Sequence, residues 1–119
     1  MNNKEFSKKL EDRTKKFALS IIRLSSQLPD TPECRVIKNQ ITKSGTSIGA
    51  NYREANRARS KADFFNKIKI CESEASETHY WLELINELEI IDKIIITENL
   101  KEVDELIAIF TSVGSKLKL

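Results

Sequence analysis

Apolar side chains recur every three or four residues along most of this chain, and this spacing constrains the fold more than any other feature. In the first segment the repeat consists of Phe6, Leu10, Thr14, Phe17, Ile21, Leu24 and Leu28. Residues with this spacing share one face of an α-helix, because three or four residues complete about one helical turn. The pattern predicts a helix over residues 4–27, and Pro29 disfavours its continuation.

Two further segments with the same spacing begin at residues that commonly cap helices. Thr31 and Pro32 suit the cap and the first position of a helix over residues 32–57. Ser60 suits the cap of a helix over residues 61–89. Both helices are therefore predicted with defined starting points.

A last helix is expected over residues 98–117, with Thr97 as its cap. The isoleucine-rich residues 90–96 favour extended structure and are interpreted as an apolar connection. Two prolines and three glycines among 119 residues leave little material for a loop-rich or all-β fold. Four helices with short connections predict an all-α, antiparallel up-down four-helix bundle, in a single domain that covers residues 1–119.

Small residues interrupt the apolar face of the second predicted helix. Gly45 and Gly49 lie four residues apart and so share one side of that helix. A glycine inside a helix costs about 1 kcal/mol relative to alanine. Two such residues imply either close backbone approach by a neighbouring helix or a helix that depends on packing for its stability.

Four polar residues stand out on the second and third predicted helices: Asn51, Glu54, Glu74 and Glu77. Asn51 is predicted to lie on the apolar face of the second helix, because it follows Ile48 by three residues. If these two helices pair antiparallel, the four side chains can meet. A buried polar group without a partner costs about 1–3 kcal/mol, so each would bond to another, to an arginine, or across a subunit boundary. They are interpreted as a polar layer that fixes the register or the oligomeric state. A ligand or catalytic pocket is the functional alternative.

Charge is distributed unevenly along the chain. Residues 1–69 hold 16 Lys and Arg against 7 Asp and Glu, a net charge of +9, whereas residues 70–119 hold 4 against 11, a net charge of −7. The two values add up to the +2 of the whole chain. Such a division favours either attraction between neighbouring helices, a basic surface for an anionic partner, or head-to-tail contact between subunits.

A basic cluster surrounds the predicted turn between the second and third helices. The candidates for contact with RNA are Tyr52, Arg53, Arg57, Arg59, Lys61 and Lys67. Arginine and lysine can neutralise phosphates, and a tyrosine ring can stack on an unpaired base. The competing interpretation is an ordinary solvated surface.

The sequence offers little support for catalysis or for a metal site. His79 has no glutamate three residues before it, so the Glu-x-x-His pattern of di-iron bundles is missing, and it is expected to be structural or interfacial. No serine has the context of a nucleophile elbow. We therefore predict no catalytic residue, no metal, no cofactor and no enzymatic activity.

The expected compartment follows from the N-terminus and the cysteines. The first residues carry no apolar segment of the kind found in secretion signals, and no stretch is long and apolar enough to cross a membrane. Cys34 and Cys71 fall on apolar faces and are expected to be buried, reduced thiols. A cytoplasmic protein is predicted.

Three stretches carry a resemblance to a known family: SGTSIGANYREA at residues 44–55, Ser60-x-x-Asp63-Phe64, and ETxYWL at residues 77–82. Together they resemble the bacterial four-helix-bundle proteins encoded by intervening sequences in 23S rRNA genes. Asn51 and Glu54 match that family's Asn-x-x-Glu signature. Glu74 and Glu77 match its acidic segment on the third helix.

The resemblance implies a small cytoplasmic bundle that assembles into a five-membered ring and has no known catalytic activity. The family is also similar to the accessory protein of diversity-generating retroelements, a ring that binds RNA and a reverse transcriptase. The expected function is thus a non-enzymatic homopentamer that binds RNA or a ribonucleoprotein through a basic face. The alternative is a protein-interaction scaffold without affinity for nucleic acid.

Overall fold

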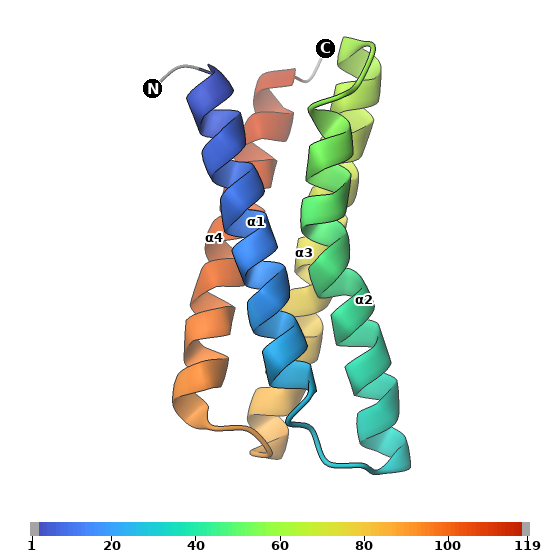
Figure 1. Ribbon diagram of the computed structural model, residues 1–119, viewed down its shortest axis with the longest axis vertical. Coiled ribbons are helices and arrows are strands. Elements are labelled where there is room, and N and C mark those ends of the chain that lie inside the picture. Colours follow the sequence, from blue (N-terminus) through green and yellow to red (C-terminus); the bar gives the residue numbers. More distant parts are fainter. Residues whose placement is uncertain (1–2, 118–119) are drawn as a thin grey trace.

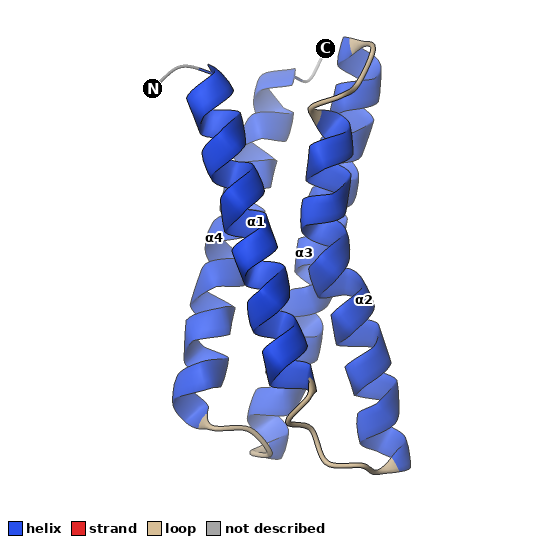
Figure 2. Ribbon diagram, in the orientation of Figure 1, coloured by secondary structure: helices blue, strands red, loops and turns tan. Residues whose placement is uncertain are grey.

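The computed structural model describes residues 3–117 and contains four helices in that range, which pack as an antiparallel up-down bundle (Figures 1 and 2). The helices are α1 (Asn3–Ser25), α2 (Pro32–Ala55), α3 (Lys61–Leu88) and α4 (Lys93–Leu117). The predicted fold class is therefore confirmed. The bundle measures 44 × 26 × 19 Å. The N-terminal end of α1 and the C-terminal end of α4 lie at the same end of the bundle as the α2–α3 turn (Figure 1).

The caps predicted for α2 and α3 are confirmed. The Thr31 hydroxyl accepts a hydrogen bond from the backbone N–H of Cys34 at 3.1 Å, and Pro32 occupies the first helical position. The Ser60 hydroxyl accepts one from the N–H of Asp63 at 3.0 Å. Each hydroxyl satisfies a backbone donor that has no partner within the helix. The α2–α3 turn is thus held at both of its ends by local chemistry.

The predicted start of α4 is wrong. The helix begins at Lys93 rather than residue 98, so Thr97 is not its cap, and only residues 89–92 connect it to α3. The carboxylate of Asp92 accepts a hydrogen bond from the Ile94 N–H at 2.9 Å, and its carbonyl accepts one from the Ile96 N–H at 3.2 Å. Burial of Ile96 compensates for the low helix propensity of three successive isoleucines.

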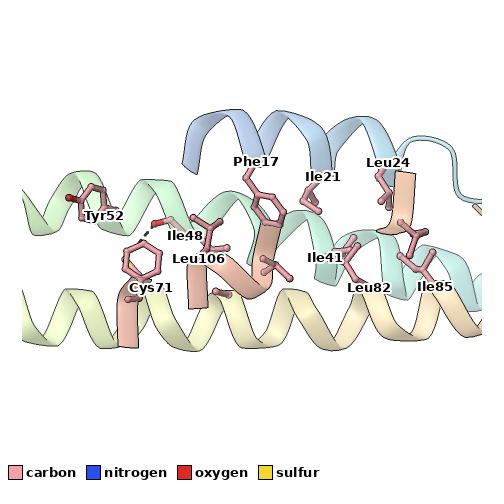
Figure 3. Packing of buried hydrophobic residues seen from close by; sticks show 14 of the residues in the cluster. Phe17, Ile21, Leu24, Ile41, Ile48, Tyr52, Cys71, Leu82, Ile85 and Leu106 are labelled. Carbon is pink, nitrogen blue, oxygen red and sulfur yellow. Dashed lines mark hydrogen bonds between the residues drawn. The ribbon is translucent and has the colours of Figure 1, made fainter. Parts of the chain in front are cut away.

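The core runs along the whole bundle and draws on every helix. Figure 3 shows Phe17, Ile21 and Leu24 of α1 facing residues of α2 and α3. Each helix buries one stripe of its surface, as the periodicity predicts. Cys34 and Cys71 are buried and free, in agreement with their predicted state.

Helix α1 approaches α2 closely where it passes the two glycines of α2. A Cβ atom built on Gly45 would lie 2.8 Å from Cγ2 of Ile21, and one built on Gly49 would lie 3.1 Å from Oγ1 of Thr14. Both glycines therefore permit the close approach that their spacing suggested. By contrast, α1 and α4 share the smallest contact among the adjacent helix pairs, and a bidentate pair from Arg13 to Glu102 (2.7 and 2.8 Å) joins them.

Candidate nucleic-acid interface and polar face

The α2–α3 turn gathers five of the six predicted RNA contacts at one end of the bundle. Arg53 lies in the last turn of α2, Arg57 and Arg59 lie in the connection, and Lys61 is the first residue of α3. These four side chains are exposed, and none forms an ion pair within residues 3–117. Four positive charges thus face solvent without a carboxylate of the described residues in direct ion-pair contact.

Lys67 differs from the other cations because it already has a partner. Its ammonium lies 3.6 Å from the carboxylate of Glu54 and joins α3 to α2. Beside this pair lies an open hollow of about 550 Å³, lined by Glu54, Arg57, Arg59, Ser60, Asp63 and Lys67. Two carboxylates and three cations leave the lining with a small positive charge, so the hollow favours an anion only moderately.

Tyr52 does not belong to this exposed cluster. Only 2% of its surface is accessible, and its ring packs against Phe110 of α4 with the ring centroids 5.8 Å apart. The prediction that Tyr52 stacks on an unpaired base is therefore wrong for this structure. The buried face of α2 passes through Tyr52 and not through its neighbour Asn51, which the sequence pattern had placed on that face.

The predicted polar residues lie on the outer side of α2 and α3 instead of forming a layer between them. Asn51 is half-buried and donates a hydrogen bond to the Ser47 carbonyl of its own helix at 2.9 Å. Glu54 and Glu77 are exposed, and the Glu77 carboxylate accepts a bond from the Trp81 indole at 3.5 Å. A buried polar layer built from these residues is therefore not found within the protomer.

Glu74 is the member of this set whose environment is least favourable to its charge. Partial burial raises the pKa of its carboxyl group, Glu77 raises it further, and Lys43 of α2 lowers it. No hydrogen bond or ion pair to the Glu74 carboxylate is found within the described residues. We call the surface that carries Lys43, Asn51, Glu54, Lys67, Glu74 and Glu77 the α2–α3 face.

The polar contact that is buried between these helices involves two hydroxyl groups. The Thr78 hydroxyl lies 2.9 Å from the Ser44 hydroxyl, and both residues are completely buried. Ser44 and Thr78 each stand on the apolar repeat of their helix, and this signal in the sequence could have identified the pair. The prediction of a polar layer selected the carboxylates instead, because charged residues stand out in a sequence more than hydroxyl groups do.

His79 connects α3 to α4. Its Nδ1 lies 3.0 Å from Glu83 and its Nε2 lies 3.2 Å from Asp104. This geometry suits the structural role predicted for His79. Among residues 3–117 no group of three or more potential ligands is arranged to hold a metal ion.

The sequence model of the 23S rRNA-intervening sequence protein family matches residues 6–112. The chain belongs to this family. Among solved structures, it is similar to a protein of unknown function from the S23 ribosomal protein family of Bacteroides thetaiotaomicron VPI-5482. The two chains are 39% identical, with a TM-score of 0.81, over 87% of this chain and 96% of the other. No curated protein matches this chain.

The matched region contains every candidate residue of the basic end and of the α2–α3 face. The neighbour in the S23 ribosomal protein family has the same overall fold, and its function is unknown. In the described part of this family member, no helix has an apolar segment that would cross a bilayer. The absence of enzymatic activity and the cytoplasmic location stay predictions.

Proposed function

We propose that this member of the 23S rRNA-intervening sequence protein family is a non-enzymatic, self-associating bundle that binds RNA through its basic end. The observation that carries the proposal is the group of four exposed cations, Arg53, Arg57, Arg59 and Lys61, which have no ion-pair partner in residues 3–117. Surface cations that are not already neutralised can displace the counterions of a phosphate backbone. Membership of the family makes RNA the anion of choice.

The proposed binding is mainly electrostatic. With Tyr52 buried, the basic cluster lacks the stacking residue that the sequence suggested for it, so we expect little dependence on base sequence. If four phosphates are neutralised, the logarithm of the affinity falls with the logarithm of salt concentration with a slope of about −3 for single-stranded RNA. Affinity then drops roughly 50-fold between 50 and 200 mM salt.

Fluorescence anisotropy with a labelled single-stranded RNA tests this proposal. The double variant Arg57→Gln/Arg59→Gln should weaken binding and reduce the magnitude of the salt slope by about 1.4, because two phosphate contacts are lost. The double variant Arg23→Gln/Lys38→Gln removes the same charge from exposed residues outside the α2–α3 turn and serves as the matched control. No binding at low salt, or equal losses in the two variants, would contradict RNA binding at this end.

Self-association is proposed to use the α2–α3 face. Partial burial of Glu74 within a single chain leaves a carboxylate that a donor from a second chain would satisfy. Ile70 is 40% exposed and lies one turn from both Lys67 and Glu74, so the face also offers apolar area. A heterologous interface of this kind closes into a ring when its rotation permits, and the family resemblance implies five subunits.

Native mass spectrometry after nuclease treatment tests the assembly. Ile70→Glu should shift the population from oligomer to monomer, because it introduces a charge into the proposed interface. The matched control is Ile22→Glu on α1, where the isoleucine is 44% exposed. Asn51→Leu should also change the oligomer distribution. A monomeric parent chain, or dissociation by both glutamate variants, would refute this interface.

The alternative function is a protein-interaction scaffold without affinity for nucleic acid. It is favoured by large apolar side chains that remain exposed on α3, where Tyr80 and Leu88 are each 53% accessible. An assembly that persists while RNA fails to bind at low salt would select the scaffold.

A further inference from the structure

A second pocket lies at the end of the bundle where α1 begins and α4 ends. It has a volume of about 610 Å³ and is lined by residues of all four helices: Asn3, Phe6, Ser7, Tyr52, Asn56, Phe64, Val113, Lys116 and Leu117. None of these residues lines the hollow beside Arg57 and Arg59. The volume is in the range of small-molecule sites, which often lie between the helices of bundles.

The walls of this pocket are mainly apolar. Phe6 of α1 is 40% exposed, and Phe64 of α3 is half-buried, with Val113 and Leu117 of α4 completing the lining. A ligand that covers these partly exposed aromatic and aliphatic surfaces binds favourably, because apolar area is removed from water. The pocket therefore suits a ligand with an apolar body.

Tyr52 supplies a polar atom at the base of the pocket. Its ring is packed against Phe110, and only 2% of the residue is exposed, yet its hydroxyl has no hydrogen-bond partner within residues 3–117. Every fully enclosed side-chain nitrogen or oxygen in the described part of the chain has a partner, so this hydroxyl must open onto the pocket that Tyr52 lines. Figure 3 shows the phenol oxygen directed away from Ile48 and the central core. Buried tyrosines usually place this group against an acceptor.

The charge around the pocket favours an anion. Lys116 is the one charged residue among the nine that line it within residues 3–117, and it forms no ion pair there. The adjoining hollow adds Lys4, whereas its Lys8 is already paired with Asp12 at 3.2 Å and its Glu11 accepts a hydrogen bond from Asn56 at 2.9 Å. A carboxylate would accept a hydrogen bond from the Tyr52 hydroxyl and balance the charge of Lys116.

We propose that this pocket binds a small amphipathic carboxylic acid, with its hydrocarbon part against Phe6, Phe64 and Val113 and its carboxylate at Tyr52 and Lys116. The pocket lies at the same end of the bundle as the basic cluster but shares no lining residue with the hollow at Arg57 and Arg59, so acid binding and RNA binding can each fail alone. Such a ligand contacts all four helices, and its binding therefore stabilises the folded chain by an amount that rises with the logarithm of its concentration above Kd.

Isothermal titration calorimetry of the full chain with octanoate tests the site, with octanol and octylammonium as probes of the head group. Octanoate should bind most tightly. Tyr52→Phe should weaken octanoate about tenfold, because one hydrogen bond to a charged group is lost. Lys116→Gln should weaken it about threefold, since that cation is exposed. Arg57→Gln, which lies outside the pocket, should leave octanoate affinity unchanged.

Val113→Trp provides a steric test, because the larger side chain fills the pocket and should abolish binding while circular dichroism reports whether the helices persist. Equal affinity for the three probes, unchanged affinity in both Tyr52→Phe and Lys116→Gln, or no octanoate binding to the full chain would overturn the proposal.

Discussion

Side chains pack differently in the middle of the bundle and at its open end, where α1 begins and α4 ends. In the middle, Gly45 lets α1 approach closely, and the Ser44 and Thr78 hydroxyls lie within hydrogen-bond distance of each other. At the open end, Tyr52 and Phe64 line a pocket of about 610 Å³, and the Tyr52 hydroxyl has no partner within residues 3–117. In the middle, small residues allow close packing of the helices and contact between their polar atoms. At the open end, larger side chains line a space between the helix ends that they do not fill.

The largest expected difference between the two regions is in the free energy of unfolding that is lost when an apolar side chain is truncated to alanine. Ile48→Ala removes a completely buried side chain in the middle and should lower the free energy of unfolding by about 3–4 kcal/mol. Phe64→Ala removes a larger but half-buried side chain beside the pocket and should cost only about 1 kcal/mol, because it leaves little new cavity. Urea denaturation measures both, and equal costs would show that the end is packed as well as the middle.

Added volume should be tolerated poorly in the middle. Gly45→Val should lower the free energy of unfolding by about 2 kcal/mol, because even a Cβ atom there lies 2.8 Å from buried Ile21. Gly114→Ala is the matched control: its Cβ would be 3.7 Å from Lys69 Cδ, an ordinary contact, and helix propensity should raise stability by up to about 1 kcal/mol. A stable Gly45→Val variant with an unchanged denaturation midpoint would refute close packing of α1 on α2.

The hydroxyl pair in the middle should show energetic coupling. In a double-mutant cycle of Ser44→Ala and Thr78→Val, the two single changes should cost more in total than the double change, with a coupling of about 1 kcal/mol. The reason is that each single change removes the partner on the neighbouring helix, and the remaining hydroxyl keeps only a carbonyl of its own helix, Ile41 for Ser44 (3.4 Å) or Glu74 for Thr78 (2.8 Å). Additive costs would mean that each hydroxyl is satisfied by its own helix backbone.

The smallest effect is expected at the open end. Tyr52→Phe should change the free energy of unfolding by less than about 0.5 kcal/mol in the absence of ligand, because the hydroxyl has no partner within the described residues. Thermal denaturation followed by circular dichroism provides the measurement. A loss above about 1 kcal/mol would show that the hydroxyl is bonded in the folded chain.

Sequence reasoning identified helices well and misplaced particular side chains. The periodicity of apolar residues and the caps at Thr31 and Ser60 predicted three of the four helices closely, because both signals are local. The start of α4 was missed because three isoleucines suggested extended structure. The cap at Asp92 and the burial of Ile96 decide that start, and the burial depends on α4 docking onto the bundle.

In the candidate site, too, local signals predicted some residues correctly and contacts between distant helices decided others. Arg53, Arg57, Arg59 and Lys61 are exposed at the α2–α3 turn, as their position in the sequence suggested. Tyr52 and Asn51 differ by one residue, or about 100° around the helix, and the pattern assigned the wrong one to the buried face. Either choice maintains an acceptable repeat, so contact with Phe110 of α4 decides which residue is buried.

By itself, the amino-acid sequence determined the number and type of the secondary-structure elements, their antiparallel order and the family, because helical periodicity, capping and short connections act within a few residues. The tertiary structure alone decided which polar groups are buried, where α4 begins and that a pocket opens between the helix ends. Those features depend on how four helices rotate and separate about a common core, and contacts between residues far apart in the chain set that arrangement.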